Sequence, residues 1–118
     1  MHAPIVSTII RWFPRVLGIF SILFISTFAL DVFGEGISVA QALLGLAVHL
    51  VPSAILLVLL VIAWRAPKAG GILFILISFI PFWLLSNELW VNLILATPFF
   101  LTGALFLFSG WYRSIKPE

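Results

Sequence analysis

The sequence predicts an all-α membrane protein built as a bundle of four transmembrane helices. Hydrophobic residues make up 64% of the chain and charged residues only 8%, whereas a soluble domain carries roughly 25% charged residues. The long charge-free stretches show none of the polar and apolar alternation expected of strands in a membrane β-barrel. A chain this apolar cannot cover its core with a polar surface. We therefore expect one integral membrane domain, residues 1–118, with the lipid bilayer as its solvent.

Four segments are long and apolar enough for a membrane helix, which needs about 20 residues. We place the helices near residues 13–34, 39–64, 69–86 and 89–112. The first helix reaches spanning length only if Asp31 belongs to it, and Gly34 and Gly36 are then expected to end it. Pro52 and Pro81 fall inside the second and third helices. Proline frees a backbone carbonyl, so each is expected to kink its helix.

The charged residues predict how these helices are oriented. The six basic residues all fall on one side of a four-helix arrangement, at Arg11, Arg15, Arg65, Lys68, Arg113 and Lys116. Asp31, Glu35 and Glu88 fall on the other side, and Glu118 is the exception. Because loops rich in Lys and Arg stay in the cytoplasm, we expect a multi-pass protein of the inner or plasma membrane with both termini cytoplasmic. There is no basic run of the kind that would indicate nucleic-acid binding.

Two further features concern the organisation of the chain. Pro14 and Gly18 are spaced like Pro67 and Gly71, and the same offset carries Glu35 onto Glu88. A true duplication would make two helical hairpins related as a parallel repeat. Apolar segments align with one another easily, so a chance similarity is the favoured interpretation. The first helix also has a small-x-small site at 27–29 that suits a cleaved signal peptide. Its long leading region, and the three spans that cleavage would leave, favour a retained helix.

Polar and small residues recur every four positions along three of the predicted helices. The stripes are Thr27, Asp31 and Glu35; Gln41, Gly45, His49 and Ser53; and Glu88, Asn92 and Ala96. Such residues avoid lipid and should face the bundle interior. The sequence therefore predicts a polar pocket that opens outward, lined by Asp31, Glu35, Gln41, His49 and Asn92.

The pocket can be interpreted in two ways, which imply different functions. A histidine within the membrane beside a carboxylate would form a proton or cation site. The favoured interpretation is plainer, namely hydrogen bonds between helices that fix their packing, worth about 0.6 kcal/mol each. Asp31, Glu35 and His49 could supply three donors for a metal, but the sequence has no His-x3-His pair and no second buried histidine. A catalytic zinc site needs about three well-placed ligands. We therefore expect no metal and no cofactor. The chain has no cysteine, no nucleophile motif and no phosphate-binding glycine loop, so we expect no enzyme activity.

Three stretches resemble a known family. They are FALDVFGE at 28–35, HLVPSAILLVLLVIAW at 49–64 and GGILFILIS at 70–78. Asp31 and Glu35 in the first stretch, and His49 and Pro52 in the second, give the resemblance its specificity. The family is an uncharacterised group of small four-helix integral membrane proteins of bacteria and archaea, described as a domain of unknown function. The resemblance implies four helices and a membrane location, and it implies no activity.

The leading functional hypothesis is a small structural or accessory subunit that packs against itself or a larger membrane complex. The second is a small transporter or channel with a proton or cation site near Asp31 and His49. A membrane enzyme comes third. The small multidrug transporters share this size and helix count, but their first helix carries a carboxylate deep in the membrane. Residues 16–30 carry none.

Overall fold

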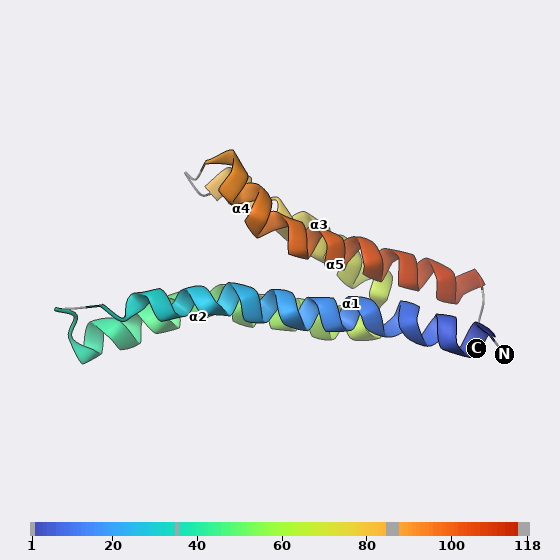
Figure 1. Cartoon of the computed structure of the whole chain (residues 1–118), viewed down its shortest axis with the longest axis horizontal. Coiled ribbons are helices and arrows are strands. Elements are labelled where there is room, and N and C mark those ends of the chain that lie inside the picture. Colours follow the sequence, from blue (N-terminus) through green and yellow to red (C-terminus); the bar gives the residue numbers. More distant parts are fainter. Residues whose placement is uncertain (1, 35, 85–87, 116–118) are drawn as a thin grey trace.

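The computed structural model describes residues 2–34, 36–84 and 88–115, and all regular structure in this part of the chain is helical. The elements are α1 (His2–Ser26), the 3₁₀ helix η1 (Thr27–Val32), α2 (Val39–Arg65), α3 (Pro67–Ser78), α4 (Ile80–Leu84) and α5 (Leu89–Ile115). They form an elongated bundle of 60 × 27 × 20 Å (Figure 1). The predicted all-α class and the four principal helices are confirmed.

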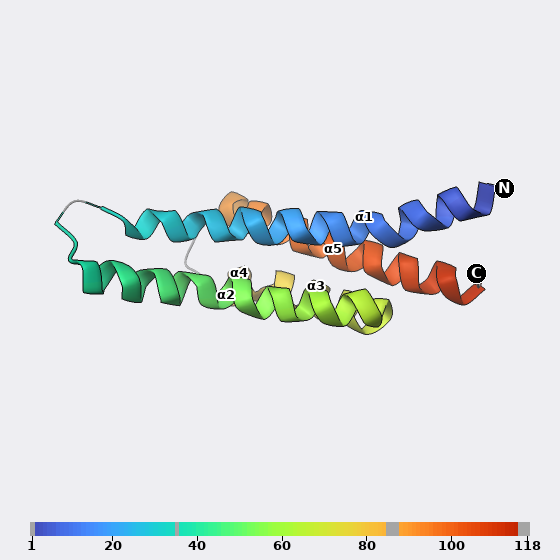
Figure 2. The same ribbon diagram turned by 90° about the horizontal axis from the view of Figure 1, so that it is seen from below.

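The helices form a ring in which each packs on two neighbours. Extended contacts join α1 to α2 and α5, and join α3 to the same two helices, with α3 against α5 the most extensive pair. The order around the ring is thus α1, α2, α3, α5, so α2 and α5 lie opposite each other. Figure 2 shows that the start of α1, the end of α5 and the connection from α2 to α3 lie toward the same end of the bundle. The basic residues that the structure describes therefore gather toward that end, namely Arg11, Arg15, Arg65, Lys68 and Arg113.

Three helical stretches are long and apolar enough to cross a membrane. They are Ile5–Leu30, Val39–Arg65 and Leu89–Ile115. The fourth, Pro67–Trp83, is shorter. At a rise of 1.5 Å per residue its 17 residues extend about 25 Å, near the lower limit for a hydrocarbon core of about 30 Å.

The first helix begins much earlier than predicted. α1 starts at His2 rather than near residue 13 and continues through Pro14, which is fully buried. The prediction placed the boundary at the basic residues, but charge marks where a helix leaves lipid and does not end its backbone hydrogen bonding. The glycine break after η1 is confirmed, because Gly36 adopts a φ of 76° that other residues rarely adopt.

The third predicted helix is broken rather than kinked. α3 ends at Ser78 and α4 begins at Ile80. Pro81 has no N–H to donate to the preceding turn. The chain instead makes a tighter turn, in which the Phe79 N–H donates to Leu76 O at 3.3 Å and the Phe82 N–H donates to Phe79 O at 3.1 Å. Pro52, by contrast, lies inside the continuous helix α2.

Glycines allow the helices to approach closely. A Cβ atom placed on Gly71 of α3 would lie 2.7 Å from the carbonyl oxygen of Gly103 on α5, and one on Gly70 would lie 2.2 Å from the Cα of Ala63 on α2. Around these contacts lies a hydrophobic core that includes Ile22, Leu56, Leu60, Ala63, Phe74, Phe99 and Phe106. Close packing through small residues is how helices associate in a membrane, where lipid is as apolar as the helix surfaces.

Candidate functional site

The five residues of the predicted polar pocket occupy different environments. Asp31 belongs to η1, with its side chain outside the described part of the structure, and Glu35 lies outside the described residues altogether. Gln41 caps the start of α2, where its Oε1 accepts the Ser38 N–H at 3.1 Å. His49 is exposed on α2, and its Nδ1–H donates to Gly45 O at 2.9 Å. Asn92 is buried in α5, with 6% of its surface exposed.

The structure does not bring Asn92 together with Gln41 and His49. α2 and α5 lie opposite each other in the ring, and the hairpin of α1 and α2 extends well beyond the outer end of α4 and α5 (Figure 1). Over that extension no further helix covers α2, so Gln41 and His49 are exposed although they continue the face of the buried Ser53. Ser53 and Asn92 are thus buried, whereas Gln41 and His49 are exposed, and the polar pocket itself stays a prediction. The roles of Asp31 and Glu35 stay predictions.

Hydroxyl groups provide the polar contacts inside the bundle. Ser26 on α1 donates to Ile22 O at 2.7 Å, so the 2.8 Å contact between Ser26 and Ser53 has the Ser53 hydroxyl as donor. Ser21 and Thr102 each donate to a carbonyl of their own helix and lie 3.5 Å apart. The Ser53 hydroxyl thus joins α2 to α1, as expected of a packing hydrogen bond. Ser21 and Thr102 are satisfied within their own helices, and their hydroxyl oxygens are only in contact where α1 meets α5. Sequence reasoning included Ser53 but missed Ser26, Ser21 and Thr102.

A second polar region lies at the basic end and centres on Arg15. This residue is buried, with 9% of its surface exposed. Its guanidinium carbon lies 4.9 Å from the ring centre of Trp12 and 4.5 Å from that of Trp64, within the range of cation–π attraction. Its Nη2–H donates to Trp64 O at 3.3 Å. Arg15 therefore fastens α1 to the end of α2.

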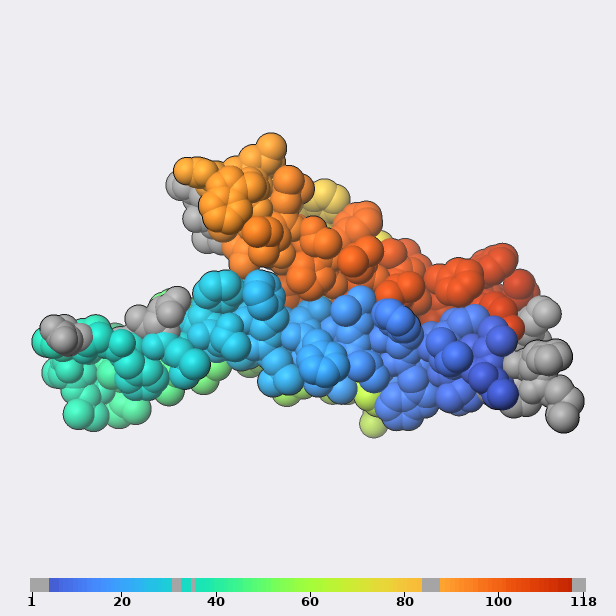
Figure 3. Space-filling view, in the orientation of Figure 1, coloured from blue at the N-terminus to red at the C-terminus, as the bar shows by residue number. Residues whose placement is uncertain are grey.

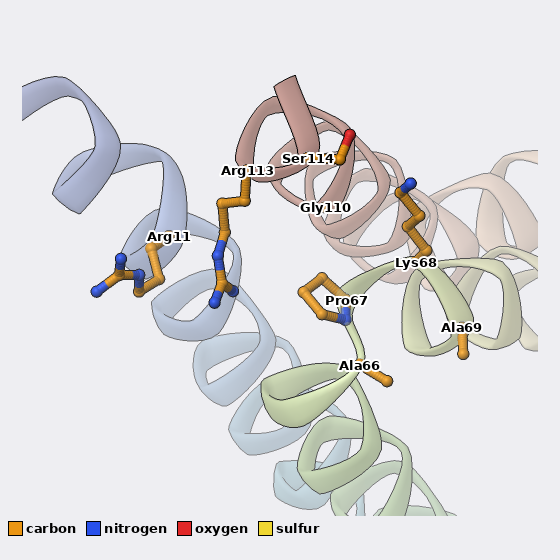
Figure 4. A pocket seen from close by; sticks show the side chains of 8 residues that line it. All are labelled: Arg11, Ala66, Pro67, Lys68, Ala69, Gly110, Arg113 and Ser114. Carbon is orange, nitrogen blue, oxygen red and sulfur yellow. The ribbon is translucent and has the colours of Figure 1, made fainter. Parts of the chain in front are cut away.

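Next to this region lies an open cavity of about 750 Å³ at the surface of the basic end (Figure 4). Its lining residues are Arg11, Ala66, Pro67, Lys68, Ala69, Gly110, Arg113 and Ser114. Three of them are cationic, and these come from three helices: Arg11 from α1, Lys68 from α3 and Arg113 from α5. Sequence reasoning treated these residues only as markers of orientation. Their convergence depends on helix packing and has no signal in a single sequence.

An apolar cleft of about 450 Å³ lies on the outer side of the core. All four principal helices and α4 line it, with Ile25, Pro52, Ile55, Ile77, Pro81 and Phe99 among the residues. Figure 3 shows how the outer ends of α4 and α5 stand apart from the hairpin of α1 and α2. Ser78 is the one hydroxyl-bearing residue in the lining, so the cleft suits apolar groups rather than a polar substrate.

Metal binding has no candidate in the described residues. No group of three or more His, Asp or Glu side chains among residues 2–34, 36–84 and 88–115 is placed to hold an ion. The side chain of Asp31 and the whole of Glu35, the two carboxylates considered from the sequence, lie outside the part of the chain that the structure describes.

These features together define an all-helical protein with three helices able to span a membrane and a concentration of cations at one end of its bundle. The chain belongs to the family described as Domain of unknown function (DUF7670), whose model matches residues 3–117. The expected membership of an uncharacterised family, described as a domain of unknown function, is therefore confirmed. No curated protein and no solved structure matches the chain.

Proposed function

We propose that this protein is a non-enzymatic, multi-pass subunit of the inner or plasma membrane that associates with a second copy of itself or with a larger membrane complex. The observation that carries the proposal is the exposure of His49. This residue lies about 15 Å along α2 from Val39 at 1.5 Å per residue. An imidazole exposed to lipid at that depth is costly, and polar side chains in membrane helices face other helices as a rule.

The surroundings of His49 support a protein partner rather than a reactive site. Its Nδ1–H is satisfied by Gly45 O, which leaves Nε2 as an acceptor directed away from its own backbone. Gly45 lies one turn away and carries no side chain, so a neighbouring helix can approach α2 closely there. The extension of α1 and α2 beyond α4 and α5 leaves the surface open to such a neighbour (Figure 1).

Photo-crosslinking from position 49 tests the proposal. A benzophenone side chain at position 49, activated in native membranes, is expected to form a protein adduct. An adduct of twice the chain mass indicates a second copy, and a heavier one indicates another subunit. The control is position 51, because Val51 lies at nearly the same depth, is 54% exposed and points to a different side of the helix. Lipid adducts alone at both positions would refute the proposal.

Four crossings with both termini in the cytoplasm form the second part of the proposal. The chain has no cysteine, so single cysteines at Ile37, Ala66, Glu88 and Ser114 provide a clean labelling series. A membrane-impermeant thiol reagent applied to intact cells is expected to label positions 37 and 88 only. Positions 66 and 114 should react after permeabilisation. Labelling at 88 that matched labelling at 66 would mean that the short α3–α4 segment does not cross the membrane.

The transporter or channel hypothesis makes a separate prediction with the same residue. If His49 belongs to a proton or cation site, liposomes containing the wild-type protein should show a pH-dependent flux that His49→Ala removes without unfolding the protein. A flux that is absent from the wild type would exclude this alternative and leave the subunit proposal in place.

A further inference from the structure

We propose that the cavity at the basic end binds a phosphate group carried by an anionic membrane lipid. The cavity has the size, the charge and the position for such a headgroup, and it is independent of the partner-binding surface around His49.

The first supporting observation is convergence of charge from separate helices. Arg11, Lys68 and Arg113 project from α1, α3 and α5 into the lining of one cavity, and none of its eight lining residues is acidic. Figure 4 shows Arg113 extending from α5 into the space between Arg11 and Pro67, whereas Lys68 points along α5 beside Ser114. Positive charge from three separate helices therefore borders the same cavity, and Arg113 extends into it.

The second observation is the buried charge of Arg15, one helical turn along α1 from the cavity-lining Arg11. Arg15 is held between Trp12 and Trp64 with 9% of its surface exposed. The neighbouring aromatic rings stabilise this guanidinium, but they do not remove the repulsion between like charges. An anion in the cavity would lower that repulsion for all of these residues together.

The third observation concerns the backbone at the start of α3. Ala66, the residue before the helix, provides no side-chain cap. The first-turn N–H groups of Lys68 and Ala69 are therefore at the exposed end of the helix, which carries a partial positive charge. Both residues line the cavity. The backbone and the side chains thus favour the same kind of ligand.

The position of the cavity favours a lipid over a soluble phosphate. It lies at the basic end of the bundle, and its lining residues Arg11 and Ala66 are close in sequence to Trp12 and Trp64. Such aromatic residues mark the depth of lipid headgroups, and basic pockets between membrane helices on the cytoplasmic side bind anionic headgroups. An arginine side chain can form bidentate hydrogen bonds to a phosphate group, whereas a lysine side chain provides a compact positive charge.

The test compares lipid binding by the wild-type protein with that of two variants. Delipidated protein in neutral detergent is titrated with phosphatidylglycerol or with phosphatidylcholine, and bound lipid is counted by native mass spectrometry. We expect the wild type to prefer phosphatidylglycerol. The double variant Lys68→Gln/Arg113→Gln should lose on the order of tenfold or more in that affinity. Arg65→Gln also removes a positive charge at the basic end but lies outside the cavity lining, so it should change affinity less than threefold.

The outcomes of this comparison decide the proposal. Equal affinity for the two lipids, or an equal loss in Arg65→Gln, would overturn it. Inorganic phosphate at millimolar concentration could displace phosphatidylglycerol from the wild type and have no such effect on the double variant. That result would support a phosphate site but assign a soluble ligand to it. Circular dichroism and gel filtration must show the double variant folded like the wild type. If it is not, Arg113→Gln alone is compared with Arg65→Gln, and an equal affinity of the two would also refute the site.

Discussion

Replacement of Arg15 by Ala is expected to lower the free energy of unfolding by about 2–4 kcal/mol, since each of two desolvated cation–π contacts contributes up to about 2 kcal/mol. The guanidinium lies 4.9 Å and 4.5 Å from the ring centres of Trp12 and Trp64. Its loss leaves a gap between α1 and the end of α2, where the two tryptophan rings are 5.5 Å apart in an edge-to-face arrangement. Unfolding in mixed micelles followed by circular dichroism measures the change.

Two comparisons separate the role of shape from that of charge. Arg15→Lys keeps the charge but replaces a flat guanidinium with a compact ammonium, so we expect it to recover only part of the lost stability. Arg65→Ala removes an exposed cation at the same end of the bundle and should change stability by less than about 0.5 kcal/mol. If Arg15→Ala were as stable as the wild type, the arginine would not hold α1 against α2.

Replacement of Gly103 by Ala is expected to destabilise the bundle by about 1–3 kcal/mol, the usual range for overpacking. A Cβ atom there would lie 2.6 Å from the Gly71 carbonyl oxygen and 2.9 Å from the Ile75 backbone nitrogen. Backbone atoms cannot rotate away, so α3 must move from α5 along the most extensive helix contact in the structure. The same unfolding titration in mixed micelles provides the measurement.

Gly18→Ala is the matched control for this prediction. Its added Cβ would meet Leu60 Cδ1 at 2.8 Å and Thr102 Cγ2 at 3.4 Å, and the tip of a leucine side chain can turn aside. Alanine is favoured over glycine within a helix by about 1 kcal/mol. We therefore expect Gly18→Ala to be near neutral or stabilising. Equal losses at positions 18 and 103 would contradict the close backbone approach of α3 and α5.

The fold was predictable from local composition to a considerable degree. The apolar segments predicted the principal helices, and Gly36 marked the break after the first of them, because helix formation in lipid depends on apolar length and backbone geometry. Two boundaries near prolines were predicted wrongly. α1 extends to His2 through Pro14, and the segment before Pro81 breaks into α3 and α4. Whether a proline is absorbed or ends a helix depends on the packing around it, which is a tertiary property.

The candidate sites were less predictable. A four-residue spacing places Gln41, His49 and Ser53 on one face of α2, and that much is a property of the helix itself. Whether the face is covered depends on where the neighbouring helices end. Ser53 is covered and bonded to Ser26, whereas His49 is exposed because α4 and α5 stop short of the outer half of α2.

The sequence by itself determined that this chain is apolar and helical, that its cations lie at the same end of the helices, and that it belongs to its family. These properties follow from residue type and order along the chain. Only the tertiary structure decided which polar residues are buried and that Arg11, Lys68 and Arg113 share one cavity. Those results depend on the close contacts of Gly70, Gly71 and Gly103, which set how near the helices lie and where they part.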